Sequence, residues 1–131
     1  MSDADLIRRS FALIAADSNA VVLLFYGRLF ELNPGARSMF RGDLRTQAAK
    51  LSATLDVLVG NAGTLDAIAG DLREMGRRHE TYGVRPEHYD LLRQALLWAL
   101  GMALQEDFDG PTRAAWDRLL VAAAQVMTGA A

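Results

Sequence analysis

The apolar residues of this chain recur at intervals of three and four almost from one end to the other. That spacing places them on one face of an α-helix, whereas the alternation of apolar and polar residues typical of a half-buried strand is missing. The sequence therefore predicts an all-α fold. A chain of 131 residues is long enough to bury a core, and no repeat, low-complexity tract or linker divides it, so we expect one domain spanning 1–131.

Seven helices, one of them very short, account for this pattern. Their expected positions are 7–14, 22–32, 34–40, 44–58, 65–79, 86–103 and 109–126. The last helix is expected to start at residues 109–111 and to turn Trp116 and Leu119 inward. Residues 17–19, Asn33 and Thr64 are of the types that cap helix N-termini, and the proline at position 34 fits the first turn of a short corner helix. Gly60, Gly63 and Gly83 fit helix ends. Short connections of this kind indicate a single compact bundle.

Composition excludes several classes of protein. With 51% apolar and 23% charged residues, the chain resembles ordinary folded domains rather than disordered ones. A net charge of -2 and scattered arginines give no basic stripe, so neither nucleic acid nor a membrane surface is an expected partner. The absence of cysteine removes disulfides, thiol nucleophiles and Cys-based zinc sites. The N-terminus shows no targeting or membrane-spanning pattern, and we expect a cytoplasmic location.

Three polar side chains fall on helix faces where apolar residues are expected, namely those of Tyr26, Gln47 and His79. An inward hydroxyl, amide or imidazole without a partner costs about 1–3 kcal/mol, so three independent cases would be expensive in a small domain. One cavity with a bound ligand would explain all three. Taken singly, each has an ordinary alternative: a histidine near a helix C-terminus favours the helix dipole, a tyrosine exposes its hydroxyl, and a glutamine faces solvent.

Several stretches, taken together, resemble the globin family, in particular bacterial single-domain haemoglobins similar to the haem domain of flavohaemoglobins. They are LLFYGRLFELNPGARSMF (23–40), Gln47 with Lys50 and Leu51, MGRRHETYGV (75–84), EHYD (87–90), AAW (114–116) and AAAQVM (122–127). The resemblance covers essentially the full chain. It implies a globin fold, a three-on-three sandwich of helices, which holds haem b.

The resemblance also implies roles for residues on the proximal side of the haem. His79 matches the histidine that ligates the haem iron through its outer ring nitrogen. The inner nitrogen would be oriented by Tyr89, which matches a family tyrosine whose hydroxyl bonds this imidazole, or by a backbone carbonyl. Val84 is expected to contact the haem. His88 is not assigned to the iron and is expected to face solvent.

On the distal side, Tyr26, Gln47 and Leu51 match the residues that surround the bound ligand. Phe40 matches the aromatic ring that wedges the haem, although plain core packing is its alternative role. Lys50 and Arg78 match positions that often reach haem propionates, and their alternative is to be solvated surface charges.

The implied function is reversible binding of dioxygen, and of NO and CO, with sulfide at ferric iron as a further candidate ligand. The alternative is an enzyme, a nitric-oxide dioxygenase that forms nitrate and needs a separate reductase, because the flavin and nicotinamide domain of flavohaemoglobins is missing. Flavohaemoglobins also place a glutamate in the last helix, and the tail QVMTGAA has no carboxylate there, which argues against strong oxygen activation. A sensor or interaction module is disfavoured, because no output domain accompanies the helices.

Overall fold

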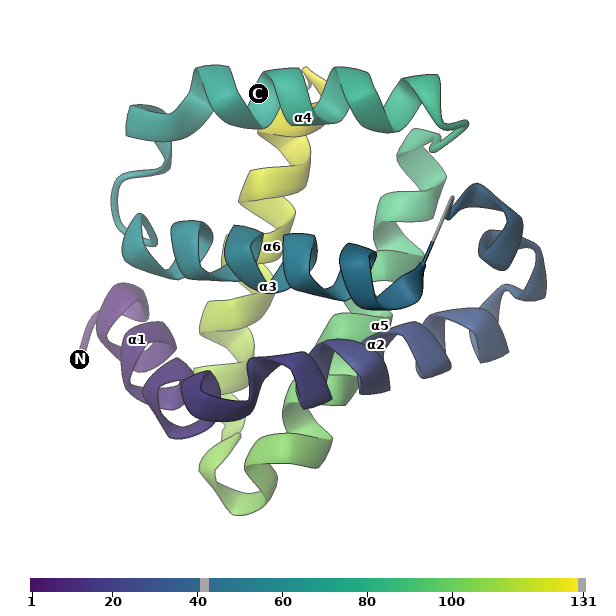
Figure 1. Ribbon diagram of the computed structural model, residues 1–131. Helices are drawn as coiled ribbons and strands as arrows, with labels where there is room; N and C mark the ends of the chain where they lie inside the picture. Colours follow the sequence, from purple (N-terminus) through teal and green to yellow (C-terminus); the bar gives the residue numbers. More distant parts are fainter. Residues whose placement is uncertain (41–42, 130–131) are drawn as a thin grey trace.

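The computed structural model describes residues 1–40 and 43–129, and this part of the chain contains six α-helices, four short 3-10 helices and no strand (Figure 1). In chain order these are α1 (Asp3–Ile14), η1 (Ala15–Asp17), α2 (Ser18–Leu32), η2 (Pro34–Met39), α3 (Leu44–Gly60), η3 (Leu65–Ile68), α4 (Ala69–Thr81), α5 (Pro86–Leu104), η4 (Gln105–Asp107) and α6 (Gly110–Thr128). The prediction of an all-α fold is confirmed.

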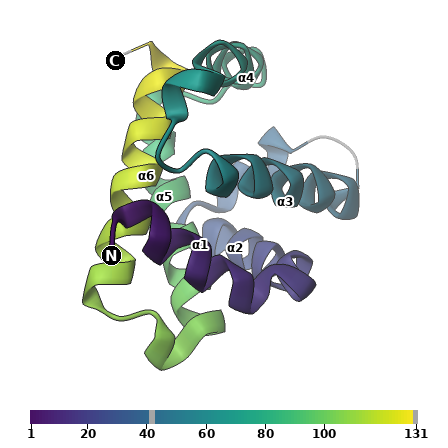
Figure 2. The same cartoon turned by 90° about the vertical axis from the view of Figure 1, so that its left-hand side faces the viewer.

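The six α-helices pack into the globin-type sandwich that was predicted. Their most extensive contacts are between α2 and α5 and between α4 and α6. In Figure 1, α3 crosses the middle of the molecule between α4 above and α2 below, while α5 and α6 run behind. The view in Figure 2 shows that α3 and α4 lie on the same side of α5 and α6.

The core contains a buried polar link between the two ends of the chain. Trp116 of α6 is completely buried, and its indole N–H donates to the hydroxyl of Ser10 in α1 at 2.9 Å. The Ser10 hydroxyl donates in turn to the carbonyl of Leu6 at 2.8 Å. Because the buried indole N–H has a partner, the large ring can fill the core without an unsatisfied donor. The inward positions predicted for Trp116 and Leu119 are confirmed.

Asp17, Asn33 and Thr64 occupy helix N-cap positions, as predicted, but they do so without side-chain caps. The side chains of Asp17, Asn33 and Thr64 make no capping hydrogen bond to the helices that follow them. A 3-10 helix adjoins each of these residues, so the first backbone N–H groups bond in a tighter pattern than in an α-helix. Asp43 and Asp109 do cap, accepting from the backbone N–H groups of residues 45 and 112 at 3.0 and 2.9 Å, and the predicted start of the last helix at 109–111 is confirmed.

By length and composition alone, the helical run Asp3–Leu32 could cross a membrane. In the fold this run is interrupted by η1, and its residues Ile7, Phe11, Val22 and Phe25 belong to the hydrophobic core. Core helices pass the same test of length and hydropathy, so the run is a weak sign of a membrane span.

Candidate functional site

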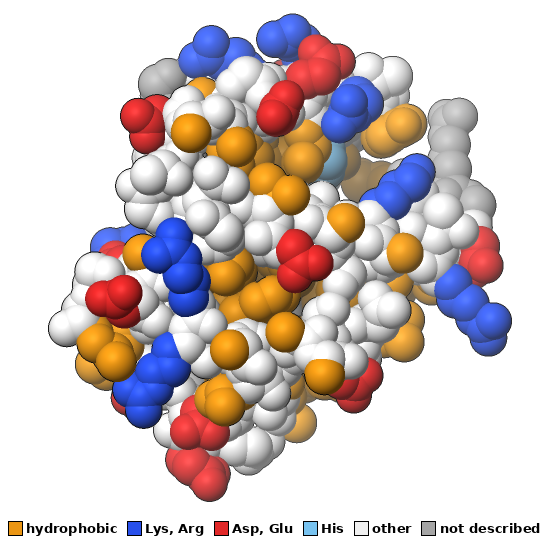
Figure 3. Space-filling model, turned by 60° about the vertical axis from the view of Figure 1, so that its left-hand side comes forward, with side chains coloured by type: hydrophobic (Ala, Val, Ile, Leu, Met, Phe, Trp, Pro, Cys, Tyr) orange, Lys and Arg blue, Asp and Glu red, His pale blue; other side chains and the backbone are white. Residues whose placement is uncertain are grey.

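A cavity of about 780 Å³ lies inside the helical sandwich, and its described walls come from α2, η2, α3, α4, α5 and α6. This size falls in the range of about 300–1,000 Å³ that is usual for sites of small molecules and cofactors. Figure 3 shows where the molecule is hollowed: hydrophobic side chains line the hollow, and a histidine lies within it. The cavity is mostly apolar, with a few polar groups that converge on it.

All nine residues singled out from the sequence line this cavity. They are Tyr26, Phe40, Gln47, Lys50, Leu51, Arg78, His79, Val84 and Tyr89. Helices α2, α3, α4 and α5 supply seven of them, while Phe40 follows η2 and Val84 lies in the connection between α4 and α5. The structure thus brings together residues from separate helices, and their roles towards a cofactor stay predictions.

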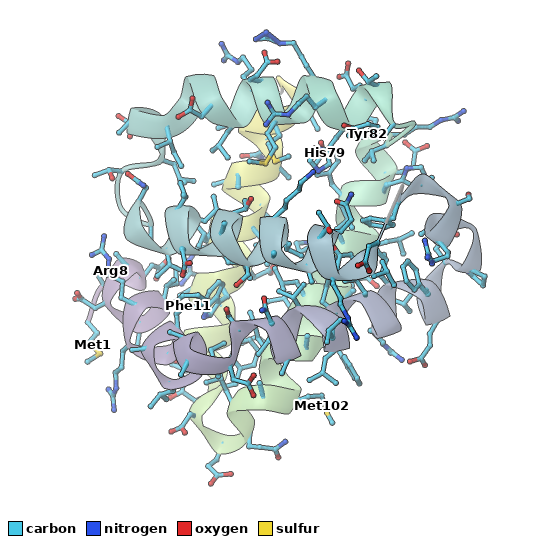
Figure 4. The ribbon with its side chains drawn as sticks, in the orientation of Figure 1. Met1, Arg8, Phe11, His79, Tyr82 and Met102 are labelled. Atoms are coloured by element: carbon cyan, nitrogen blue, oxygen red, sulfur yellow. The ribbon has the colours of Figure 1, made fainter. Side chains whose placement is uncertain are left out.

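His79 is half-buried near the end of α4, and Figure 4 shows it on the side of α4 that faces α3. Its Nδ1 atom lies 2.7 Å from the carbonyl oxygen of Met75, one turn earlier. A carbonyl can only accept, so Nδ1 must carry the proton in this hydrogen bond. In the neutral imidazole, this arrangement leaves the lone pair on the other ring nitrogen, Nε2, which is the atom that can bind a metal.

Tyr89 of α5 contacts His79 through its ring rather than its hydroxyl. The two ring centroids lie 6.3 Å apart at an interplanar angle of 32°. Of the two expected partners for the inner nitrogen of His79, the backbone carbonyl of Met75 is the one that bonds it in the described part of the chain. Burial, assisted by the negative charge of Glu80, raises the pKa of Tyr89, so its hydroxyl stays protonated at neutral pH.

Tyr26 of α2 is only 4% exposed, and its ring packs against those of Phe25 and Phe40, each at 5.1 Å between centroids. Burial raises the pKa of Tyr26 to about 12, so the group remains a neutral phenol that can donate a hydrogen bond. Gln47 and Leu51, both half-buried on α3, line the same cavity.

The charged groups at the cavity have one sign. Lys50 and Arg78 are exposed, whereas Arg93 is bonded to Asp117 at 2.7 Å and to Asp90 at 3.1 Å. Within the described ranges, none of the residues that line the cavity is an aspartate or a glutamate. The lining residues from α6 are all apolar. The tail QVMTGAA, in which the sequence has no carboxylate, covers residues 125–131, and residues 130 and 131 lie outside the described part of the chain. A ligand with carboxylates would meet cations here and no described acidic side chain.

His88 does not lie where it was expected. It is half-buried and lines the cavity, and its Nδ1 accepts a hydrogen bond from the backbone N–H of Arg85 at 2.9 Å. The expectation of a solvent-facing ring was wrong because the first turn of α5 lets the ring fold back onto the residue that precedes the helix.

Two residues that support the site were missed from the sequence. Phe30 is one turn after Tyr26 in the same helix and stacks on it, and Gly76 lies three residues before His79 at the contact of α4 with α6. A glycine inside a helical stripe costs about 0.5–1 kcal/mol relative to alanine, so Gly76 could have been flagged as a close-packing position. Phe30 gave no comparable signal, because apolar residues are common at that spacing.

Comparisons with known proteins show which family this chain is similar to. The globin family model matches residues 23–127. A neuroglobin of Tetraodon nigroviridis is 23% identical over 128 residues, covering 87% of this chain and 80% of the neuroglobin. A protein of Oryza sativa subsp. indica, named anaerobic nitrite reductase NSHB5, is 26% identical over 119 residues, covering 86% and 82%.

Among solved structures, the chain is similar to protein PA3967 of Pseudomonas aeruginosa PAO1, which is described as structurally highly homologous to a human haemoglobin. The identity is 28%, the match covers 98% of this chain and 97% of the other, and the TM-score is 0.85. With a family match over most of its length and a shared fold over nearly all of it, the chain belongs to the globin family.

Proposed function

We propose that this globin binds haem b in its large cavity and reversibly holds dioxygen, with NO and CO as further ligands. One observation carries the proposal. The imidazole of His79 lines the same cavity as the phenol of Tyr26, and its hydrogen bond to Met75 uses Nδ1, so that Nε2 is the ring nitrogen left to bind a metal.

The residues present fit a haem. His79 would bind the iron, and Phe40, Leu51 and Val84 would contact the porphyrin through apolar side chains. Lys50 and Arg78 would pair with the two propionates, since both are exposed cations at the cavity. When bound, haem iron supplies an open coordination position at which a diatomic ligand can be held.

On the proximal side, the carbonyl of Met75 holds the proton of His79 at Nδ1. This contact fixes the position of the Nδ1 proton, limits rotation of the ring and makes Nε2 a better electron donor, all of which would suit His79 to hold the haem iron.

On the distal side, the hydroxyl of Tyr26 would donate a hydrogen bond to a ligand oxygen that carries partial negative charge. Such a charge-assisted bond contributes about 1.5–3 kcal/mol, or roughly ten- to a hundredfold slower escape of the ligand. Gln47 would assist as a second donor, and Leu51 would keep water out. The same donors would suit sulfide at ferric iron, because that ligand is anionic.

Nitric-oxide dioxygenase activity is the alternative, and it depends on how fast the ferric protein is reduced after each turnover. The similarity to a rice protein named as an anaerobic nitrite reductase adds nitrite to the candidate reactants. Rapid NO consumption sustained by a cellular reductase would favour the enzyme, and slow re-reduction would favour reversible binding.

The test is an absorption spectrum of freshly purified or haemin-reconstituted protein, recorded in the ferric state and then after reduction under CO. We expect a Soret band that is retained through gel filtration and shifts sharply when CO binds. A colourless protein that does not retain haemin would overturn the proposal.

A further inference from the structure

We propose that Phe30 is a positioning residue that sets the direction of the Tyr26 hydroxyl, and so the strength of its hydrogen bond to a bound ligand. This inference rests on the proposed function, because it concerns the donor that the ligand would meet. It assigns a role in ligand affinity to a side chain that is not among the described residues lining the cavity.

The rings of Tyr26, Phe30 and Phe40 form a closed triangle. Their centroids are 6.1 Å apart for Tyr26 and Phe30, 5.1 Å for Tyr26 and Phe40, and 5.8 Å for Phe30 and Phe40. The first pair is stacked at 20°, and the other two are edge-on at 81° and 71°. Offset stacking and edge-to-face contacts at such distances are the favourable arrangements of aromatic rings. Each ring in the triangle therefore restrains the other two.

Ring packing is what orients Tyr26. In the described part of the chain its hydroxyl makes no hydrogen bond to another residue, so no polar contact there fixes the side chain. A tyrosine hydroxyl lies on the long axis of its ring, and the oxygen moves wherever the ring tilts. Phe30 lies four residues further along α2, which places it on the same helix face as Tyr26.

Phe30 is the member of the triangle whose effect can be isolated. Tyr26 and Phe40 both line the cavity, so replacing either changes the ligand or haem contacts directly. Phe25 also touches Tyr26, but it lines the cavity as well. Phe30 is half-buried behind these residues, so any effect of its ring on a ligand must pass through Tyr26 or Phe40.

The test replaces Phe30 in the haem-reconstituted protein, with Phe30→Leu and Phe30→Met as two variants that remove the ring but keep an apolar side chain. We expect dioxygen to dissociate about two- to tenfold faster in both, in line with the strength of an aromatic pair. The infrared stretching band of the CO complex should move towards that of Tyr26→Phe, while the resonance Raman band of the iron–histidine bond stays unchanged. Phe30→Tyr keeps the ring and should restore the wild-type rate.

Two controls separate positioning from a general loss of packing. Phe108→Leu removes a half-buried phenylalanine that packs on the core near Gly101 rather than on Tyr26, and it should leave the dissociation rate unchanged. In a Tyr26→Phe background, Phe30→Leu should have no further effect on the rate, because the hydroxyl that it positions is gone.

The outcomes distinguish the two proposals. A wild-type chain that fails to retain haemin overturns both. If haem binds but Tyr26→Phe leaves the rate unchanged, the role of Tyr26 and the role of Phe30 both fall, while haem binding stands. Phe30 is not a positioning residue if Tyr26→Phe accelerates dissociation and Phe30→Leu does not. The same conclusion follows if Phe30→Leu accelerates dissociation as much in the Tyr26→Phe background as in the wild type.

Discussion

Gly76 of α4 lies against the carbonyl group of Met127 in the last turn of α6, so closely that a β-carbon at position 76 would fall 1.9 Å from the carbonyl oxygen. Backbone atoms of α6 cannot swing away as a flexible side chain could. Glycine therefore permits the close approach of α4 to α6. Because His79 follows three residues later in the same helix, the close contact with Met127 also sets where that imidazole lies.

Gly76→Ala should destabilise the protein. Overpacking usually costs about 1–3 kcal/mol, which exceeds the gain of about 0.5–1 kcal/mol from replacing a helical glycine by alanine. We expect a lower urea midpoint for the haem-free protein and faster loss of haem from the reconstituted one. Gly70→Ala, in the same helix, is the matched control: nothing lies within 4 Å of its β-carbon, so it should be neutral or stabilising. Equal stability of Gly76→Ala and wild type would contradict the close contact.

His79→Ala should abolish tight haem retention, because it removes the proposed ligand of the iron. The Nδ1 atom of His79 bonds the backbone carbonyl of Met75, so Nε2 is the nitrogen left for the metal. Haem transfer to an acceptor protein and the ferrous absorption spectrum measure this loss, and added imidazole should restore part of the spectrum. His88→Ala is the control, since His88 Nδ1 bonds the backbone N–H of Arg85. An unchanged spectrum in His79→Ala, or a loss of the axial ligand in His88→Ala, would show that His79 is not the ligand.

The helices of this fold were predictable from the sequence because their cause is local. Apolar spacing of three and four residues requires only neighbours along the chain, and it placed Trp116 and Leu119 correctly in the core. The N-cap positions of Asn33 and Thr64 were also predictable, but the absence of a capping hydrogen bond from their side chains was not, because its cause is not local. Whether a turn becomes 3-10 or α-helical depends on small differences that tertiary packing decides, and 3-10 turns follow both residues.

The candidate site was predictable as a set of residues but not as a set of contacts. The match to family motifs and the helix phase were enough to find lining residues such as Tyr26, His79 and Tyr89. Phe30 and Phe40 are in contact although η2 separates them in the chain. Gly76 contacts the end of α6, which is also distant in the sequence. Neither contact follows from periodicity, because both depend on how helices approach each other in the folded protein.

Replacing Lys50 and Arg78 by glutamine should speed haem loss by a few-fold for each charge, the size usual for exposed ion pairs. Haem dissociation kinetics at low and high salt measure the effect, which should shrink as salt screens the charges. With haem dimethyl ester, which has no carboxylates, wild type and variants should behave alike. Arg77→Gln is the control, since Arg77 pairs with Glu74 at 3.2 Å and does not line the cavity. Identical haem loss in all variants would leave Lys50 and Arg78 as surface charges.

Tyr26→Phe should raise the dissociation rate of dioxygen by about an order of magnitude or more, because it removes the donor to a partly negative ligand oxygen. Stopped-flow replacement of dioxygen by CO measures the rate. Tyr82→Phe is the control, since Tyr82 also lines the cavity but is 52% exposed. No change in Tyr26→Phe would transfer the role of donor to Gln47 or to neither residue.

The ionisation of Tyr26 predicts how the haem-free protein responds to alkaline pH. Burial raises the pKa of Tyr26 from 10.0 to about 12, so the folded protein keeps the phenolic proton longer than the unfolded chain does. Below pH 10 both states are protonated and the stabilisation is fully present. As pH rises from about 10 to about 12, the unfolded chain releases the proton first, and the free energy of unfolding falls.

Tyr26→Phe removes this titration, so its free energy of unfolding should fall less steeply above pH 10 than that of wild type. Part of the slope will remain in the variant, because burial also raises the pKa of Tyr89. Urea unfolding at a series of pH values measures the slopes, and Tyr82→Phe, which replaces an exposed ring, should follow wild type. Parallel slopes for wild type and Tyr26→Phe would mean that water reaches the Tyr26 hydroxyl in the haem-free cavity, and that the phenol ionises as readily there as in the unfolded chain.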